Sequence, residues 1–367
     1  MKKQIEITKI ENYLNIVINN VNKIIKFKKI KNPKISIISP IYNREHFILR
    51  FLKSIQNQNF NKIEIILIDD FSKDNTITII EEYKKKDKRI LFLKNKKNKG
   101  TFISRNIASL YAKGDYLIFS DPDDIISKNI LNRCYIYAKK YKYDIIRFNM
   151  YQGNKYISYE TIFNDLPNKP IYQPELSYYL FYGNKNKLSI IDHNLCNKFI
   201  RKEVYIKVLD KLNENYLNIY MTYSEDFLFN YFLFKTANSL FYYKKIGYYY
   251  IKNHLSITNN LFKKSNLKIN FLFIKLKLFF DYSKNTNIEK DIFNLLLTHF
   301  NINNIKLIIS PFDKNDYKFY YNILKNLINC KFITKENKKI LLLSKNLIEK
   351  RIIKRLKKGN KIFYKYD

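Results

Sequence analysis

Short apolar runs alternate with amphipathic segments between residues 33 and 150. The apolar runs are rich in Ile, Leu and Phe and are short enough for buried strands, whereas the segments between them repeat their apolar residues at helical spacing. We therefore predict strands at 35–39, 63–68, 90–93 and 116–119, and helices at about 47–55, in a stretch that ends at 86, and at about 102–112. This alternation favours an α/β fold with a mixed, mostly parallel sheet sandwiched by helices.

Both ends of the chain have a helical period instead. In residues 1–32 the apolar positions predict an added helix that packs on the domain or on a partner; they are Ile10, Leu14, Val17, Ile18 and Val21. Residues 261–367 are predicted to form a basic helical C-terminal region. Near its end one helix has an apolar face (Ile348, Ile352, Ile353, Leu356) and a basic face (Lys350, Arg351, Lys354, Arg355, Lys357, Lys358). Such a helix is typical of membrane-surface binding, of a calmodulin target, or of a docked terminal helix with a solvated face.

The chain is strongly basic. It has 68 Lys and Arg against 32 Asp and Glu, a formal net charge of +36, and 46% of its residues are hydrophobic. That apolar content excludes a disordered polycation, so we predict a globular protein. The charge has two interpretations: an anionic partner such as nucleic acid or a lipid surface, or Lys residues that simply occupy solvated positions along the chain.

Cysteine usage and apolar runs bear on the compartment. Three cysteines without a CxxC pair indicate neither a disulfide framework nor a zinc site, and they favour a reducing, cytoplasmic compartment. The longest uncharged stretch, residues 292–305, is too short and too rich in Asn to span a bilayer, which needs about 20 apolar residues. No secretory signal is predicted. The basic tail leaves a peripheral contact with a membrane as an open expectation.

Two clusters of Asp directly follow predicted strands. The first comprises Asp69, Asp70 and Asp74, and the second comprises Asp121, Asp123 and Asp124. Asp after a strand is also ordinary turn or helix-cap chemistry. Two carboxylates on either side of Pro122, whose φ is fixed, can instead present oxygen ligands to Mg²⁺ or Mn²⁺. Because ligands of parallel sheets bind beyond the carboxyl ends of the strands, the clusters predict a binding site there.

Four short motifs follow one another between residues 35 and 124. They are Ile35-Ser-Ile-Ile-Ser-Pro-Ile-Tyr-Asn43, Ile68-Asp-Asp-Phe-Ser-Lys-Asp-Asn75, Asn98-Lys-Gly-Thr-Phe-Ile-Ser-Arg-Asn106 and Asp121-Pro-Asp-Asp124. In this order and spacing they resemble the motif set of family 2 glycosyltransferases with the GT-A fold. The resemblance is clear over 33–150, fainter to about 260 and absent beyond. It implies a glycosyltransferase domain at 33–260, with a nucleotide-binding half at 33–150 and an acceptor half at 151–260.

The resemblance also implies an activity. A sugar would move, with inversion, from a nucleotide-diphosphate sugar, expected to be UDP-linked, to a glycan or lipid-linked acceptor, with Mn²⁺ or Mg²⁺ bound. A metal held by carboxylates neutralises the charge that builds up on the leaving nucleoside diphosphate. By resemblance, Asp123 is the metal ligand, and Asp121 contacts the ribose or shares the metal.

The same resemblance assigns the donor side of the site. Asp70 matches the position that hydrogen-bonds the base, with Pro40 and Tyr42 as the floor under the nucleoside. Gly100 permits close approach of the backbone to a ligand. Arg105 can offer a bidentate cation to phosphate or base; the alternative interpretation is a surface charge on a helix.

A later segment, Tyr223-Ser-Glu-Asp-Phe-Leu-Phe229, resembles the Glu-Asp motif that starts a helix in the family. It implies Asp226 as the general base and Glu225 as a helper carboxylate that positions the helix start or the acceptor. Ordinary helix capping, with acids in the first turn, accounts for the same residues. His254, in a tyrosine-rich segment, is implied as a third metal or phosphate contact. Lys198 is either a diphosphate contact or a solvated side chain.

The chain departs from the family pattern in two ways. It contains no Trp, so the Gln-x-x-Arg-Trp motif of processive members is missing. Because no transmembrane helix is predicted either, we expect a single-addition enzyme. Phe71 also stands where Gly commonly follows the Asp pair, which leaves the conformation of that loop open.

Two other functions remain open on the sequence. The chain could be a non-catalytic basic protein that binds nucleic acid or a membrane. Nucleic acid is the less favoured partner, because carboxylates at two strand ends would repel phosphate. The chain could also be a degenerate transferase that keeps the fold as an interaction module, against which the intact Asp123 and Asp226 count.

Overall fold

The computed structural model describes residues 21–22, 32–152, 157–158, 169–177, 194–217 and 225–251, together with the single positions 339, 342 and 346, which are helical. The chain divides into two compact units, residues 1–252 and residues 253–367. The fold that follows is that of the first unit. The basic helix predicted around 348–358 and His254 lie outside the described residues.

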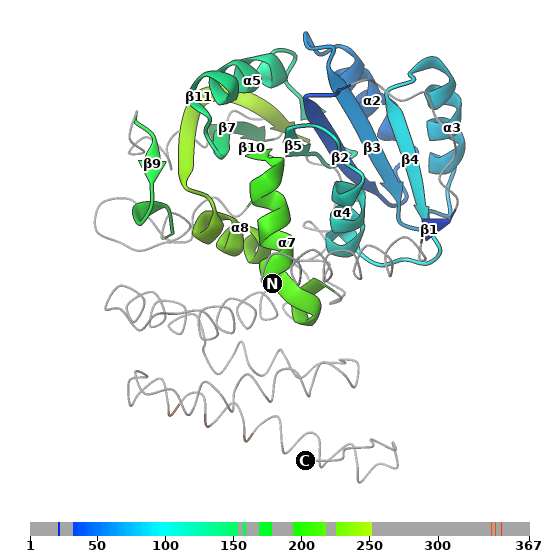
Figure 1. Cartoon of the computed structure of the whole chain (residues 1–367). Helices are drawn as coiled ribbons and strands as arrows, with labels where there is room; N and C mark the ends of the chain where they lie inside the picture. The colour runs from blue at the N-terminus through cyan, green and yellow to red at the C-terminus, as the bar shows by residue number, and fades with distance from the viewer. Residues whose placement is uncertain are drawn as a thin grey trace. The chain divides into compact units, whose positions relative to one another are not determined.

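A mixed sheet forms the centre of the first unit (Figure 1). Its strands follow the order β1 (Val21–Asn22), β4 (Ile90–Asn95), β3 (Ile63–Asp69), β2 (Ile35–Ile41), β5 (Tyr116–Phe119), β10 (Lys198–Arg201), β7 (Ile145–Gln152), β11 (Ser239–Tyr250) and β6 (Ile125–Ile126), while β8 (Ile157–Ser158) pairs with β7 and β9 (Ile171–Tyr172) with β11. Strands β4, β3, β2 and β5 are parallel, as are β7 and β11, and β10 lies antiparallel between β5 and β7. The predicted mixed, mostly parallel sheet is confirmed.

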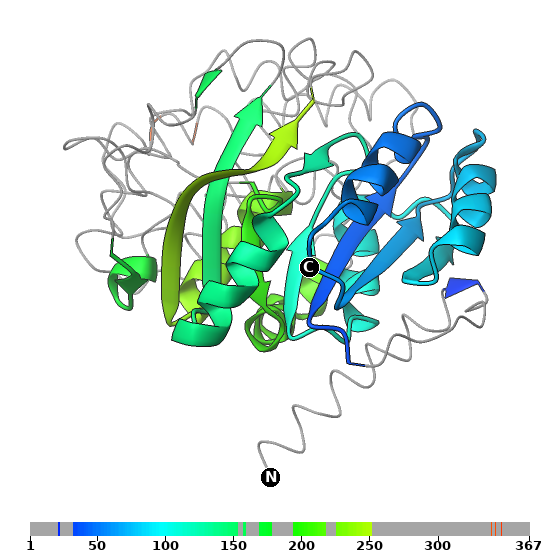
Figure 2. The same cartoon turned by 90° about the horizontal axis from the view of Figure 1, so that it is seen from above.

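Helices cover both faces of this sheet (Figures 1 and 2). One face carries α2 (Ile48–Gln56), α3 (Thr76–Lys86) and α5 (Ile130–Tyr141), and the other carries α4 (Thr101–Leu110), α7 (Lys202–Leu217) and α8 (Glu225–Thr236). Because both faces are covered, β2 and β3 are buried at all of their positions. In the part of the chain that is described, no helix has the length and apolar character needed to cross a bilayer.

The periodic pattern located the elements between 35 and 119 correctly. Each predicted strand is present, and β2 and β4 run two residues farther than predicted. β2 is extended by its parallel ladder with β3, whereas β4 is extended by the pairing of Lys94 with Asp69 and of Asn95 with Val21. Pro40 pairs with Ile68 and Ile41 pairs with Asp69 in the ladder of β2 with β3. The strand ends therefore carry the acidic motifs directly to the edge of the sheet.

The amino-terminal segment departs from the prediction at Val21. Val21 and Asn22 form β1, which pairs antiparallel with Asn95 and Lys94 of β4, so the helix predicted through Val21 is wrong at this residue. The outer edge of β4 offers backbone donors and acceptors to a further strand, and a β-branched residue suits that conformation. The other positions of the predicted helix lie outside the described residues.

Candidate active site

Strands β2, β3 and β5 end at one edge of the sheet and bring the predicted motifs together. In the parallel ladder Ile41 lies opposite Asp69, and β5 pairs along the other side of β2. Tyr42, Asp70 and Asp121, which follow these strands, therefore lie along the same edge. This is the edge at which open α/β sheets bind their ligands.

The turn after β3 is organised by the Asp69 carboxylate. It accepts hydrogen bonds from the main-chain N–H groups of Phe71 and Ser72, each at 3.1 Å. Phe71 has a φ of 74°, the left-handed conformation that glycine adopts most easily. The loop thus keeps a glycine-type backbone although a phenylalanine occupies the position. Asp69 is a turn residue in this structure.

Asp70 fixes the loop that leads into α4. One carboxylate oxygen accepts from Asn95 Nδ2 and from the main-chain N–H of Lys99, and the other accepts from the N–H of Gly100, all at 2.8 Å. Gly100 has a φ of 83° and directly precedes α4. Asp70 therefore fixes the backbone at Lys99 and Gly100, where the absence of a side chain on Gly100 leaves room for a ligand close to the main chain. The contacts of Asp70 and Gly100 with a nucleotide stay predictions.

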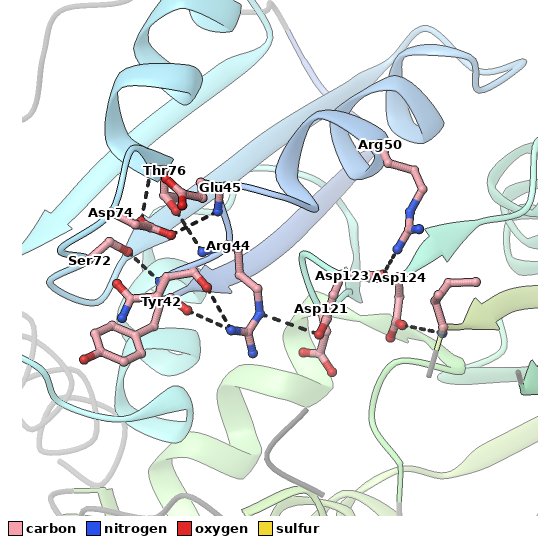
Figure 3. Close-up of polar contacts among 12 residues, drawn as sticks. Tyr42, Arg44, Glu45, Arg50, Ser72, Asp74, Thr76, Asp121, Asp123 and Asp124 are labelled. Carbon is pink, nitrogen blue, oxygen red and sulfur yellow. Dashed lines mark hydrogen bonds and ion pairs between the residues drawn. The ribbon is translucent and has the colours of Figure 1, made fainter. Parts of the chain in front are cut away.

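Two arginines that were not among the predicted site residues contact the Asp121–Asp124 turn (Figure 3). Arg44 Nε lies 3.5 Å from Asp123 Oδ2, and Arg44 Nη1 donates to two carbonyl oxygens of its own loop at 3.0 Å. Arg50, on α2, donates from Nη2 to the main-chain oxygen of Asp123 at 2.6 Å. The position of Arg44 directly after the first motif was an available signal. Nothing in the local pattern marked Arg50.

Arg105 joins the two acidic motifs. Its Nη1 donates a short hydrogen bond to Asp226 Oδ1, and its Nη2 lies 3.7 Å from Asp121 Oδ1. The residue is 5% exposed, so its interpretation as a surface charge is wrong. Burial alone would lower the pKa of Arg105, but the carboxylates of Asp226 and Asp121 raise it, and the guanidinium stays charged. One buried cation therefore bridges carboxylates that are far apart in the sequence.

Asp226 and Glu225 begin α8, as the motif predicts. The second oxygen of Asp226, Oδ2, accepts a hydrogen bond from the main-chain N–H of Leu195 at 2.9 Å, so the carboxylate is held from two sides. Burial raises the pKa of Glu225 to about 7, and the charge of Asp226 adds to the shift. The start of a helix is a rigid and electrostatically favourable platform for these acids.

Asp121 and Asp123 offer oxygen atoms suited to a divalent cation. Partial burial raises the pKa of Asp121 to about 6, with the charges of Asp123 and Asp226 adding to the effect and Arg105 opposing it. The described residues contain no group of three or more His, Cys, Asp and Glu side chains arranged around a metal. Two carboxylates completed by substrate phosphate oxygens are the usual set for Mg²⁺ at phosphate sites, and this pair fits that pattern.

Tyr248 supports the Asp121–Asp124 turn from the interior of the protein, through a hydrogen bond to Asp124. Both are buried, and the Tyr248 hydroxyl donates to Asp124 Oδ2 at 2.8 Å. The carboxyl of Asp124 has a pKa well above its usual range because it is buried beside Asp121 and Asp123. Asp124 belongs to the acidic cluster that the sequence shows, whereas no local pattern points to Tyr248, because 124 positions separate the two residues.

The remaining predicted residues fall into different places. Pro40 lies within β2, and Tyr42 follows it with 44% of its surface exposed, which leaves the ring accessible at the sheet edge. Lys198 is fully buried, and its Nζ donates to the Asn197 side chain at 2.8 Å, so its interpretation as a solvated side chain is wrong. His254, the implied third metal or phosphate contact, lies outside the described residues.

Known proteins are similar to this chain in sequence and in fold. The model of the family described as Glycosyl transferase family 2 matches residues 36–209. An uncharacterized glycosyltransferase of Mycoplasma genitalium is 30% identical over 233 residues, which make up 61% of this chain and 72% of that protein. The chain belongs to glycosyl transferase family 2. The resemblance inferred from the motifs is thereby confirmed.

Two further proteins show how far the likeness of this family 2 chain extends. A poly(ribitol-phosphate) beta-glucosyltransferase of Bacillus spizizenii is 40% identical over 115 residues, 30% of this chain and 18% of that protein. The crystal structure of S. aureus TarS 1–349 in complex with UDP-GlcNAc has a TM-score of 0.59 at 20% identity, and covers 91% of this chain and 94% of that chain. This likeness confirms the predicted GT-A fold. The match with several curated relatives spans 40% or less of their length.

Proposed function

We propose that this family 2 protein transfers a single sugar, with inversion, from a UDP-linked sugar to a glycan or lipid-linked acceptor, with Asp226 as the general base. One observation carries the proposal. Arg105 contacts Asp226 and approaches Asp121, so the implied base and the implied donor-side carboxylate meet beyond the carboxyl ends of the strands. Asp226 and Asp121, both held by the buried Arg105 guanidinium, suit a site where one acid takes up a proton while a diphosphate leaves beside the other.

Asp226 would accept the proton of the acceptor hydroxyl. A carboxylate has about four lone-pair positions. Arg105 and the N–H of Leu195 occupy one on each oxygen, which leaves positions for the hydroxyl while the group is held in place. The acceptor oxygen then bonds to the anomeric carbon from the face opposite the diphosphate, whose bond to that carbon breaks. Glu225, the neighbouring acid, would help to position the acceptor.

Asp121 and Asp123 would bind Mn²⁺ or Mg²⁺ together with the donor diphosphate. When bound, the cation neutralises the charge that develops on the departing nucleoside diphosphate. Arg44, 3.5 Å from Asp123, and Arg50, bonded to the main chain of the same residue, hold that carboxylate in place. Asp70, Pro40, Tyr42 and Gly100 would form the nucleoside side of the site. His254 remains a candidate further contact.

The choice of donor and acceptor rests on relatives. TarS has been crystallised with UDP-GlcNAc, and the Bacillus spizizenii relative is named for transfer to poly(ribitol-phosphate). A UDP-sugar and a hydroxyl-rich glycan or phosphate-linked polymer are therefore the substrates to test first. A peripheral membrane contact through residues 261–367 stays a prediction.

A thermal-shift screen of nucleotide sugars with and without Mn²⁺ tests the proposal. A ligand that binds the folded state raises the unfolding temperature by mass action. We expect UDP-sugars to stabilise the protein in the presence of Mn²⁺, Asp123→Ala to remove that effect, and Asp226→Asn to retain it. If no nucleotide sugar stabilises the protein while single-stranded RNA or DNA does, the nucleic-acid hypothesis replaces this one.

A further inference from the structure

Tyr248, on β11, reaches the Asp121–Asp124 turn from the interior of the protein. Its hydroxyl donates to Asp124 Oδ2 at 2.8 Å and accepts from the main-chain N–H of Asp121 at 3.0 Å. Asp124 Oδ1 in turn accepts from the main-chain N–H of Ile251 at 2.8 Å. One carboxylate therefore ties the turn to Tyr248 of β11 and to Ile251, the residue that follows β11.

Neither group of this pair is available to a substrate. Tyr248 is 0% exposed and Asp124 is 1% exposed. A buried carboxyl group is costly unless hydrogen bonds satisfy it, and here both of its oxygens are bonded to β11 or to the residue that follows it. The backbone of β11 is itself fixed, because Tyr248 pairs with Ile126 and Tyr249 with Ile125 of β6.

The hydrogen bond from the Asp121 main chain to Tyr248 links the buried pair to the donor side of the site. The N–H that donates to Tyr248 belongs to Asp121, whose carboxylate lies beside Arg105 in the site. Asp123, two residues later, lies between this point and the anchored Asp124. Both proposed cation-binding carboxylates thus belong to a short turn that is anchored to β11 at its two ends.

We propose that Tyr248 and Asp124 are positioning residues of the donor site, which set the placement of the Asp121 and Asp123 carboxylates without touching the substrate. The inference rests on the proposed function. It extends that function to Tyr248, a buried residue to which the family motifs assign no role. Hydrogen-bond partners behind metal-binding side chains orient them, and their loss costs about 10- to 100-fold in metal affinity or activity.

The same strand supplies a matched control. Tyr242 is also on β11 and is also buried, and its hydroxyl bonds to the Asn149 side chain instead of to the Asp121–Asp124 turn. Tyr248→Phe and Tyr242→Phe each remove one buried hydroxyl from one strand. A change found in the first variant and not in the second reports on the turn and not on a loosened core.

The test is calorimetric titration of the full chain with UDP and with GDP, each at saturating and at limiting Mn²⁺, alongside the unfolding temperature. We expect Tyr248→Phe and Asp124→Asn to weaken Mn²⁺-dependent nucleotide binding by about 10-fold or more, and Tyr242→Phe to leave it unchanged. In turnover assays the donor KM should rise in the first two variants while the acceptor KM stays constant. Asp124→Asn decides the question if Tyr248→Phe does not fold.

The outcomes separate this inference from the proposed function. If Tyr248→Phe and Asp124→Asn bind nucleotide with Mn²⁺ as tightly as wild type does, the inference alone is overturned. Equal weakening in Tyr242→Phe also overturns it, because the effect would then be general. A wild-type protein that binds neither nucleotide with Mn²⁺ overturns the proposed function and this inference together.

Discussion

At the residue scale, the side chain that connects the two halves of the site is Arg105. It is buried, it bonds to Asp226, and it lies 3.7 Å from Asp121. The motif that contains Arg105 was visible in the sequence, but its partner was not, because the bonded residues are 121 positions apart. A local pattern can mark a residue as interesting, whereas only the folded chain determines whether it meets a phosphate or a carboxylate.

Substitution of Arg105 separates its charge from its geometry. Arg105→Gln removes the cation between two carboxylates, and we expect turnover to fall by about 100-fold or more. Arg105→Lys keeps the charge but cannot reach both carboxylates with a planar fork, so its turnover should lie between that of wild type and that of Arg105→Gln. Steady-state release of nucleoside diphosphate measures both effects, and Arg105→Gln turnover equal to wild type would contradict this role.

The raised pKa values of the site predict a dependence on pH. The pKa of Asp121 is about 6 and that of Glu225 about 7, because both groups are partly buried near other acids. Below these values the groups are protonated, so cation binding and turnover should fall as the pH drops from about 7 to about 6. Because a cation competes with the proton for Asp121, more Mn²⁺ should move the acidic midpoint to lower pH. A midpoint independent of Mn²⁺ would speak against Asp121 as a ligand.

At the element scale, the sequence located what local periodicity encodes. Strands β2 to β5 and helices α2 to α4 were predicted because each carries its own apolar pattern. The pairing of β10 between β5 and β7, and of β11 with β7, could not be read in this way, since these contacts join distant segments. β1 was mistaken for a helix because two residues on a sheet edge carry too little pattern to outweigh the neighbouring helical spacing.

The turn between β3 and α3 tests how backbone conformation and side chain are matched. Phe71 has a φ of 74°. Lys73 Nζ lies over its ring, 3.5 Å from the ring centroid. Phe71→Gly and Phe71→Ala both remove that ring contact, but only glycine adopts the conformation without strain. We expect Phe71→Gly to be more stable to urea than Phe71→Ala by about 1 kcal/mol. The reverse order would show that the turn changes conformation when the ring is lost.

At the scale of the whole molecule, a strongly basic chain carries a cluster of acids at one edge of its sheet. The net charge is +36, yet the edge beyond β3 and β5 carries the Asp clusters and lies beside the start of α8, where Glu225 and Asp226 stand. Every described residue of this site belongs to the compact unit of residues 1–252. The positive charge elsewhere would help to attract an anionic donor, whereas a nucleic-acid partner would leave the acidic edge without a role.

The most direct test of the proposed function is the release of UDP from a panel of UDP-sugars by wild type, Asp123→Ala and Asp226→Asn, each with and without Mn²⁺. We expect Mn²⁺-dependent release by wild type, loss of that release in Asp123→Ala, and a fall of about 100-fold or more in Asp226→Asn with UDP binding retained. Unchanged release in Asp226→Asn would contradict its assignment as the base. Release that is equal with and without Mn²⁺ would contradict the cation-assisted reaction.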